Sequence, residues 1–196
     1  MEKAAYLEMY REYAKGNYLI MTSNSFIDVR IPWEPEKALG FAYNRAMKTV
    51  EDWVLFIDHD VLLDLHGDWY ARCQRAIKQV GDKAGIISCM TNAIGCPIQR
   101  ATMDKTMDLA FHIQKAKELA DHYGDEIFDV TDAQWKLSGF FMLTRKSVWE
   151  KTGPFPDNKF IGADNWYHDR VKENGYRIYI IPGLYVYHGY CRFWKG

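Results

Sequence analysis

The most informative part of the sequence is WVLFIDHDVLL, residues 53–63. Its first five residues, from Trp53 to Ile57, are all apolar, which is typical of a strand buried on both faces of a sheet. The run ends abruptly in Asp58-His59-Asp60. Charged side chains at the end of a buried strand are unfavourable unless a partner or a bound ion compensates them. Because ligands of open α/β sheets bind at the carboxyl ends of the strands, we expect a ligand site here.

Asp58 and Asp60 are suited to hold a hard divalent cation and to present it to a phosphate group. The D-x-D pattern alone has low specificity, because on the order of one copy is expected by chance in a chain this rich in Asp. This copy is the only one in the sequence, and it stands at the end of a predicted strand. The alternative is that both carboxylates only cap the turn that follows.

Composition and charge limit the classes of function. The chain has 196 residues, of which 48% are hydrophobic and 15% aromatic, enough for a single domain over residues 1–196 with a substantial core. A net charge of -1 does not indicate a nucleic-acid-binding surface. We see no signal peptide, and the apolar runs are too short to span a membrane. The four cysteines lack C-x-x-C spacing. We therefore expect a cytoplasmic protein with reduced, mostly buried thiols.

Helical patterns alternate with short apolar runs along the chain, which predicts an α/β fold with a mostly parallel sheet flanked by helices. Helices are expected over residues 2–15, 36–50, 68–80, 104–123, 147–151 and 164–173. Strands are expected over residues 18–21, 53–57, 85–90, 127–130, 140–143, 177–181 and 184–188, with an extended segment over 26–33. Asp68 is expected to cap the third of these helices.

The second half of the chain carries an ordered set of motifs. A glycine precedes an apolar strand, a basic pair leads into a short helix, and Gly-x-Phe follows. An acidic residue then opens a helix that contains an arginine, and a glycine precedes the last strands, which end in a histidine. The residues are Gly139, Arg145-Lys146, Gly153-Pro154-Phe155, Asp164, Arg170, Gly175 and His188. Together with Asp58-His59-Asp60, this set resembles the family-2 glycosyltransferases of GT-A fold, over roughly residues 36–190.

The resemblance implies a metal-dependent transfer of a hexosyl or N-acetylhexosaminyl group from a nucleotide-diphosphate donor to an acceptor hydroxyl, with inversion. The expected donor is a UDP-sugar. Such a reaction leaves negative charge on the pyrophosphate, which a bound Mn²⁺ or Mg²⁺ can stabilise. The expected metal ligands are Asp58, Asp60 and His188. The alternative for His188 is a histidine whose hydrogen bonds are satisfied at the sheet edge.

The acceptor hydroxyl must lose its proton on the opposite face of the sugar, so a carboxylate base is required there. The resemblance points to Asp164 for this role. Its predicted position at the start of a helix leaves open the alternative that it is only an N-cap. Gly139 is expected in the donor pocket, together with Asp58.

The beginning of the chain departs from the family pattern, in which two early strands carry the nucleotide-binding unit. Here a predicted helix comes first and one clear strand follows, so we expect a shortened or altered N-terminal unit. The residues expected to contact the base and ribose are Thr22, Asn24 and Asp28. Two other functions remain open: a nucleotidyltransferase of related fold, and a non-catalytic remnant that binds glycans or partners.

Overall fold

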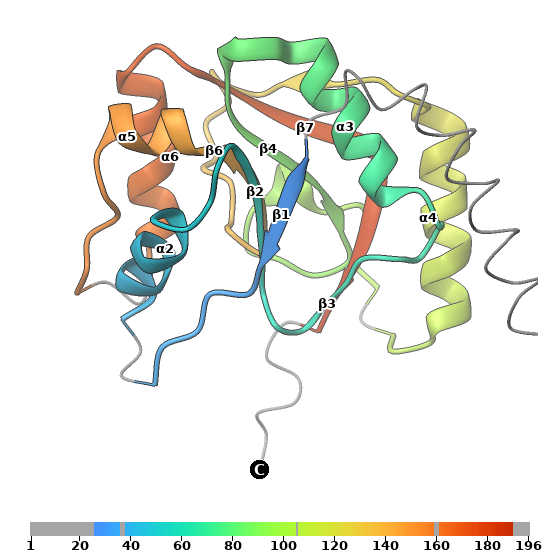
Figure 1. Ribbon diagram of the computed structural model, residues 1–196. Coiled ribbons are helices and arrows are strands. Elements are labelled where there is room, and N and C mark those ends of the chain that lie inside the picture. Colours follow the sequence, from blue (N-terminus) through green and yellow to red (C-terminus); the bar gives the residue numbers. More distant parts are fainter. Residues whose placement is uncertain (1–25, 36–37, 105, 159–160, 190–196) are drawn as a thin grey trace, which may run out of the picture.

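The computed structural model describes residues 26–35, 38–104, 106–158 and 161–189 (Figure 1). Seven strands in this part of the chain form a sheet in the order β1-β2-β6-β4-β7-β3, and β5 pairs with β7. The strands are β1 (Ile27–Arg30), β2 (Trp53–Ile57), β3 (Val61–Leu62), β4 (Ala84–Thr91), β5 (Phe128–Asp129), β6 (Phe141–Arg145) and β7 (Arg177–His188). The α-helices are α2 (Leu39–Met47), α3 (Trp69–Val80), α4 (Leu109–Tyr123), α5 (Lys146–Thr152) and α6 (Ala163–Glu173).

The α/β class is confirmed, but the predicted mostly parallel sheet is wrong. β1 runs parallel to β2, and β4 runs parallel to β7. β6 is antiparallel to both β2 and β4, and the short strands β3 and β5 are antiparallel to β7. A strand buried on both faces has the same apolar pattern in either direction, so the sequence pattern does not encode its direction. Because Phe141 pairs with Ile57, β6 begins at the carboxyl end of β2.

Side chains of β2 alternate between two hydrophobic cores on opposite faces of the sheet. Trp53, Leu55 and Ile57 belong to the core that includes Cys73 and Ile77 of α3. Val54 and Phe56 belong to the other core, which contains residues of α2, α5 and α6. Figure 1 shows α2, α5 and α6 grouped on one side of the sheet and α3 on the other. The five-residue apolar run is therefore explained by burial on both faces.

Two predictions at helix starts are wrong. The helix expected over residues 104–123 begins only at Leu109, after Asp108, whose carboxylate accepts a hydrogen bond from the Ala110 N–H. Short polar side chains before it bind nearby backbone N–H groups, and such local bonds compete with helix formation. Asp68 stands at the cap position of α3 but makes no capping bond; its carboxylate pairs with Arg72 instead (2.9 Å).

β7 is one continuous strand, whereas two strands separated by Pro182-Gly183 were expected. The pairing with β4 is interrupted at this point: Cys89 pairs with Ile181, but Met90 pairs with Tyr185, so β7 carries three additional residues. A side chain at Gly183 would place its Cβ 2.6 Å from the Gly124 carbonyl oxygen, so only glycine fits there. The extra residues form a bulge within one continuous strand. The Pro-Gly pair had instead indicated a turn between two strands.

The strand β3 was not predicted, and the other described α-helices and strands agree with their predicted ranges to within three residues. Cys73, Cys89 and Cys96 are buried free thiols, as expected. The helix expected over residues 2–15, the strand over 18–21 and Cys191 lie outside the described residues. None of the described helices has the length and apolar character required to cross a membrane.

Candidate functional site

Three segments meet where β2 ends. The backbone N–H of Asp58 donates to the carbonyl of Phe140, one residue before β6 (3.0 Å). Beyond the turn that contains Asp60, Val61 of β3 pairs with His188, the last residue of β7. The end of β7 is therefore fixed beside the D-x-D motif, although the two are more than 120 residues apart in the sequence.

One ligand atom from each of Asp58, Asp60 and His188 lies within 4.8 Å of the other two. The His188 Nε2 atom lies 3.3 Å from an oxygen of Asp60 and 3.5 Å from an oxygen of Asp58. The exposed fraction of the side chain rises from 4% for His188 and 9% for Asp60 to 42% for Asp58, so the group opens to solvent on the Asp58 side. The structure brings together the three predicted metal ligands, and metal binding by them stays a prediction.

The imidazole of His188 is held on both of its nitrogens. Nδ1 lies 3.1 Å from the Ala93 carbonyl oxygen, which only accepts, so Nδ1 carries a hydrogen. Burial opposes protonation of the ring, but hydrogen bonds to Asp58 and Asp60 and their negative charges outweigh it and raise the pKa of His188 to about 9. The ring of Phe140 stacks on the imidazole with centroids 5.3 Å apart. A cation at this place would displace the Nε2 proton and meet a lone pair of fixed direction.

The donor atoms of this group suit a hard divalent cation. Two carboxylates and one imidazole provide oxygen ligands for Mn²⁺ or Mg²⁺ and one nitrogen ligand that Mn²⁺ accepts. The open Asp58 side leaves room for oxygens of a bound phosphate. The residues present therefore fit the implied metal.

Asp164 is the second residue of α6, and its carboxylate binds the backbone of the segment that leads into β6. One oxygen accepts from the Gly139 N–H (2.9 Å) and the other from the Asn165 N–H (2.8 Å). The cap position is occupied by Gly162, so the interpretation of Asp164 as the N-cap residue is wrong. Gly139 is followed by Phe140, which holds the backbone of Asp58. Asp164 is therefore joined to the D-x-D motif through two consecutive residues.

Sequence reasoning missed Tyr43, whose hydroxyl lies beside Gly139 and close enough to Asp58 and Asp164 to be affected by their charges. The side chain is buried, and its hydroxyl oxygen lies 3.4 Å from the position that a Cβ of Gly139 would take. Burial, followed by the negative charges of Asp58 and Asp164, raises the pKa of Tyr43 well above its ordinary value. The phenol therefore stays protonated and can donate a hydrogen bond. Its position on the apolar face of a predicted helix marked it only as a core residue.

Phe155 of the Gly-x-Phe motif packs against the ring of Tyr43. The ring of Phe155 stacks between those of Tyr43, with centroids 4.7 Å apart, and Tyr167, with centroids 4.5 Å apart. The backbone of Phe155 is fixed by the side chain of Asn44, which accepts from its N–H and donates to its carbonyl, both at 2.8 Å.

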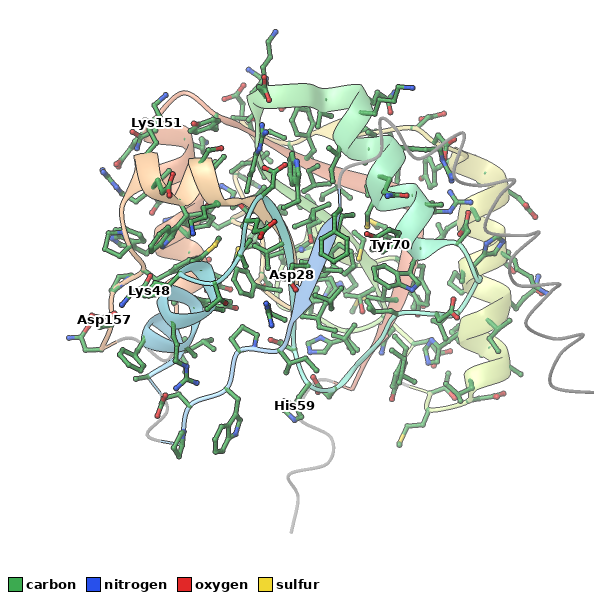
Figure 2. The ribbon with its side chains drawn as sticks, viewed as in Figure 1. Asp28, Lys48, His59, Tyr70, Lys151 and Asp157 are labelled. Atoms are coloured by element: carbon green, nitrogen blue, oxygen red, sulfur yellow. The ribbon has the colours of Figure 1, made fainter. Side chains whose placement is uncertain are left out.

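Of the three residues predicted to contact the base and ribose, Asp28 belongs to the described part of the chain, and it does not lie at this group. Asp28 pairs in register with Val54, four residues before Asp58, and its carboxylate forms an ion pair with Arg30 (2.6 Å). Figure 2 shows Asp28 on β1 near the middle of the sheet and His59 at its lower edge. Thr22 and Asn24 lie outside the described residues. The nucleotide contacts of all three stay predictions.

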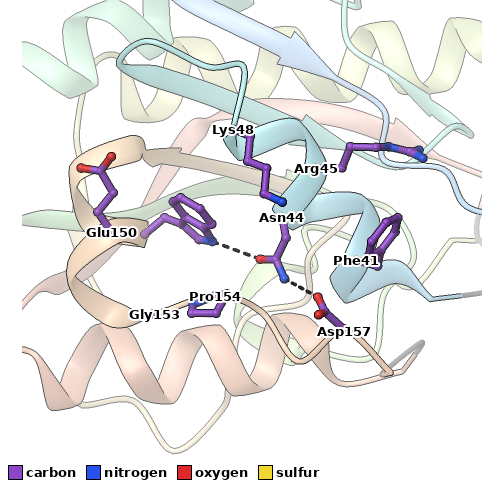
Figure 3. Close-up of a pocket in the computed structure, with 9 residues that line it drawn as sticks. Phe41, Asn44, Arg45, Lys48, Glu150, Gly153, Pro154 and Asp157 are labelled. Atoms are coloured by element: carbon purple, nitrogen blue, oxygen red, sulfur yellow. Dashed lines mark hydrogen bonds between the residues drawn. The ribbon is translucent and has the colours of Figure 1, made fainter.

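A separate hollow of about 510 Å³ lies beside α2 and α5 and is lined by none of the predicted site residues (Figure 3). Asn44 crosses it, accepting from the Trp149 Nε1–H (3.1 Å) and donating to the Asp157 carboxylate (2.7 Å). These bonds, with those to Phe155, use both donors and the acceptor of the amide. The central amide of the hollow is therefore fully bonded within the protein.

A scan against protein-family models finds no match to this chain, and a search of curated proteins finds no similar sequence.

Proposed function

We propose that this protein is a metal-dependent glycosyltransferase that moves a sugar from a nucleotide-diphosphate donor, a UDP-sugar, to an acceptor hydroxyl with inversion. The observation that carries the proposal is the convergence of Asp58, Asp60 and His188 at the end of β2, with Asp164 bound to the adjoining Gly139. This arrangement offers a cation site and a separate carboxylate on neighbouring segments, as the chemistry requires.

Asp58, Asp60 and His188 are the proposed ligands of Mn²⁺ or Mg²⁺. When bound, the metal supplies positive charge that stabilises the leaving pyrophosphate. Asp58 is half-exposed, so this group of ligands opens to solvent on the Asp58 side. The phosphates of the donor would enter from there. His188, fixed by Ala93, keeps the donor atom aimed at that place.

Asp164 is the proposed general base. Each of its oxygens accepts one backbone N–H, which fixes the carboxylate while leaving lone pairs for the proton of the acceptor hydroxyl. Tyr43 remains protonated near Asp58 and Asp164, and its hydroxyl is the proposed hydrogen-bond donor to the sugar donor or the acceptor. Gly139 keeps the space between Tyr43 and Asp164 free of a side chain.

Binding of UDP, GDP and CTP, measured by isothermal titration with and without Mn²⁺, tests this function, followed by a screen of sugar donors scored by released nucleotide. Metal-dependent binding of a nucleoside diphosphate and release of that diphosphate on transfer support the proposal. Preferential binding of CTP with release of pyrophosphate would instead identify a nucleotidyltransferase. Glycan binding without nucleotide binding would identify a non-catalytic remnant.

A further inference from the structure

The segment Thr91–Ala93, at the end of β4, holds His188 at several points. The side chain of Asn92 accepts from the backbone N–H of His188 (2.8 Å) and donates to its carbonyl oxygen (3.2 Å). The next residue, Ala93, binds the imidazole through its carbonyl. One short segment therefore fixes both the main chain and the ring of the proposed metal ligand.

The side chain of Asn92 makes the two hydrogen bonds to His188 that the backbone of a paired strand would otherwise make. The register of β4 with β7 ends at Thr91 opposite Val186, two residues before His188. Its carboxamide presents an acceptor and a donor to a single residue of β7, as a neighbouring strand would. The side chain is 1% exposed, and the Thr91 hydroxyl donates to its oxygen (3.2 Å), which fixes the orientation of the amide.

We propose that Asn92 is a positioning residue, which sets the place of His188 so that its Nε2 atom reaches the cation held by Asp58 and Asp60. This inference rests on the proposed metal-dependent function. The bonds of Asn92 end on the backbone of the ligand itself, and outer residues that orient a metal ligand commonly determine much of the metal affinity.

The test uses Mn²⁺ alone and the whole chain. Asn92→Ala should weaken Mn²⁺ binding by about 10–100-fold, the range usual for losing a residue that orients a ligand. The imidazole nitrogen coupling to Mn²⁺, measured by electron spin echo envelope modulation, should be lost or reduced. In a His188→Ala background the same substitution should cause no further loss, because Asn92 acts through His188.

Asn44→Ala is the matched control. Asn44 holds the N–H and carbonyl of Phe155 in the same two-point manner, but Phe155 is not a proposed ligand. This variant should lower the melting temperature while keeping the Mn²⁺ affinity and the nitrogen coupling. Should Asn92→Ala fail to fold, Asn92→Asp takes its place. A carboxylate there still accepts from the His188 N–H but repels its carbonyl oxygen, so the coupling should again fall.

The outcomes separate the two proposals. Wild-type Mn²⁺ affinity and nitrogen coupling in the Asn92 variant would overturn the role of Asn92 while leaving the metal site intact. Equal losses in the Asn44 variant, or a further loss in the His188→Ala background, would reduce Asn92 to a general stabilising residue and overturn it too. No Mn²⁺ binding by the wild-type protein would overturn both this role and the metal-dependent function.

Discussion

The candidate metal centre and the hollow beside α2 both contain polar groups, but they differ in the balance of their charges. In the centre, Asp58 and Asp60 share one imidazole. The lining of the hollow contains two cationic and two acidic side chains, and its central amide is fully bonded within the protein. A region with uncompensated charge at the end of strands favours a bound ion more than a region whose charges are balanced. The charge balance is therefore the feature that distinguishes the candidate site from the hollow.

The largest expected effect is at the metal centre. Asp60→Ala removes one of the two carboxylates, and should reduce Mn²⁺ affinity by more than about 100-fold, beyond the loss usual for an outer residue. The metal-dependent gain in nucleotide binding should disappear with it. Isothermal titration of UDP with Mn²⁺ and with EDTA measures both. Asp157→Ala, which removes an acidic residue of the hollow, should leave both unchanged, and equal UDP binding in EDTA by the wild-type protein contradicts the metal requirement.

The next effect concerns Asp164. Asp164→Asn should lower sugar transfer by roughly 10²–10⁴-fold, the range usual for a lost general base, with donor binding retained. The amide has only one acceptor oxygen for two backbone N–H groups, so we also expect a loss of about 1 kcal/mol in the free energy of unfolding. Asp169→Asn is the control, because Asp169 pairs with Lys136 at the surface of the same helix. Near wild-type transfer by the Asp164 variant would refute the catalytic role.

Tyr43→Phe should have a smaller effect, because it removes only a hydroxyl from a ring that remains stacked on Phe155. Loss of one hydrogen bond to a charged group, ~1.5 kcal/mol, predicts a decrease in transfer of about 10-fold. Melting temperature should change little. Tyr167→Phe, on the other side of Phe155, is the control, since its hydroxyl binds Thr144 away from the carboxylates. Equal rates for the wild type and the Tyr43 variant would exclude the hydroxyl from the reaction.

The last prediction concerns the pH dependence of stability and leaves metal binding and sugar transfer aside. Burial, followed by the charge of Lys172, lowers the pKa of His168 to about 4, and its Nδ1 atom accepts from the Leu137 N–H (3.2 Å). Between pH 6.5 and 4 the unfolded chain binds this proton and the folded protein does not. Stability should therefore fall as the pH drops through this range, by at most about 1.4 kcal/mol per pH unit.

Urea unfolding at pH 7, 5.5 and 4.5 measures this slope. His168→Gln carries no titrating group, so its stability should fall less than that of the wild type over the same range. Parallel curves for the two proteins would show that His168 does not contribute to the acid sensitivity.

The sequence was sufficient for features that depend on local pattern. The apolar run of β2 predicted burial on both faces, which the two cores confirm; the ligand site expected at its acidic end stays a prediction. The direction of β6 was not predictable, because both-face burial leaves the same apolar pattern in parallel and antiparallel strands. The start of α4 was missed because local side-chain bonds from residues before Asp108 compete with the helix.

Within the candidate site, the ordered motifs predicted Asp58, Asp60, His188 and Asp164, and the structure brings the first three together. Tyr43 and Asn92 were not predicted. A tyrosine at helical spacing looks like any core residue, and an asparagine after a strand looks like any turn residue. Their roles depend on contacts with residues far along the chain, which a single sequence does not reveal.

The bulge in β7 also reverses the alternation of side chains along the strand. Before it, the odd-numbered Tyr179 and Ile181 enter the core that contains α3; after it, the even-numbered Leu184 and Val186 do so. An insertion of three residues, an odd number, exchanges the two faces of a strand. Because of the bulge, the even-numbered positions after it, His188 among them, lie on the face that the odd-numbered Tyr179 and Ile181 occupy before it. A variant of this chain that gains or loses two residues at 182–184 should therefore keep the histidine on the same side, whereas a change of one residue should turn it to the opposite face.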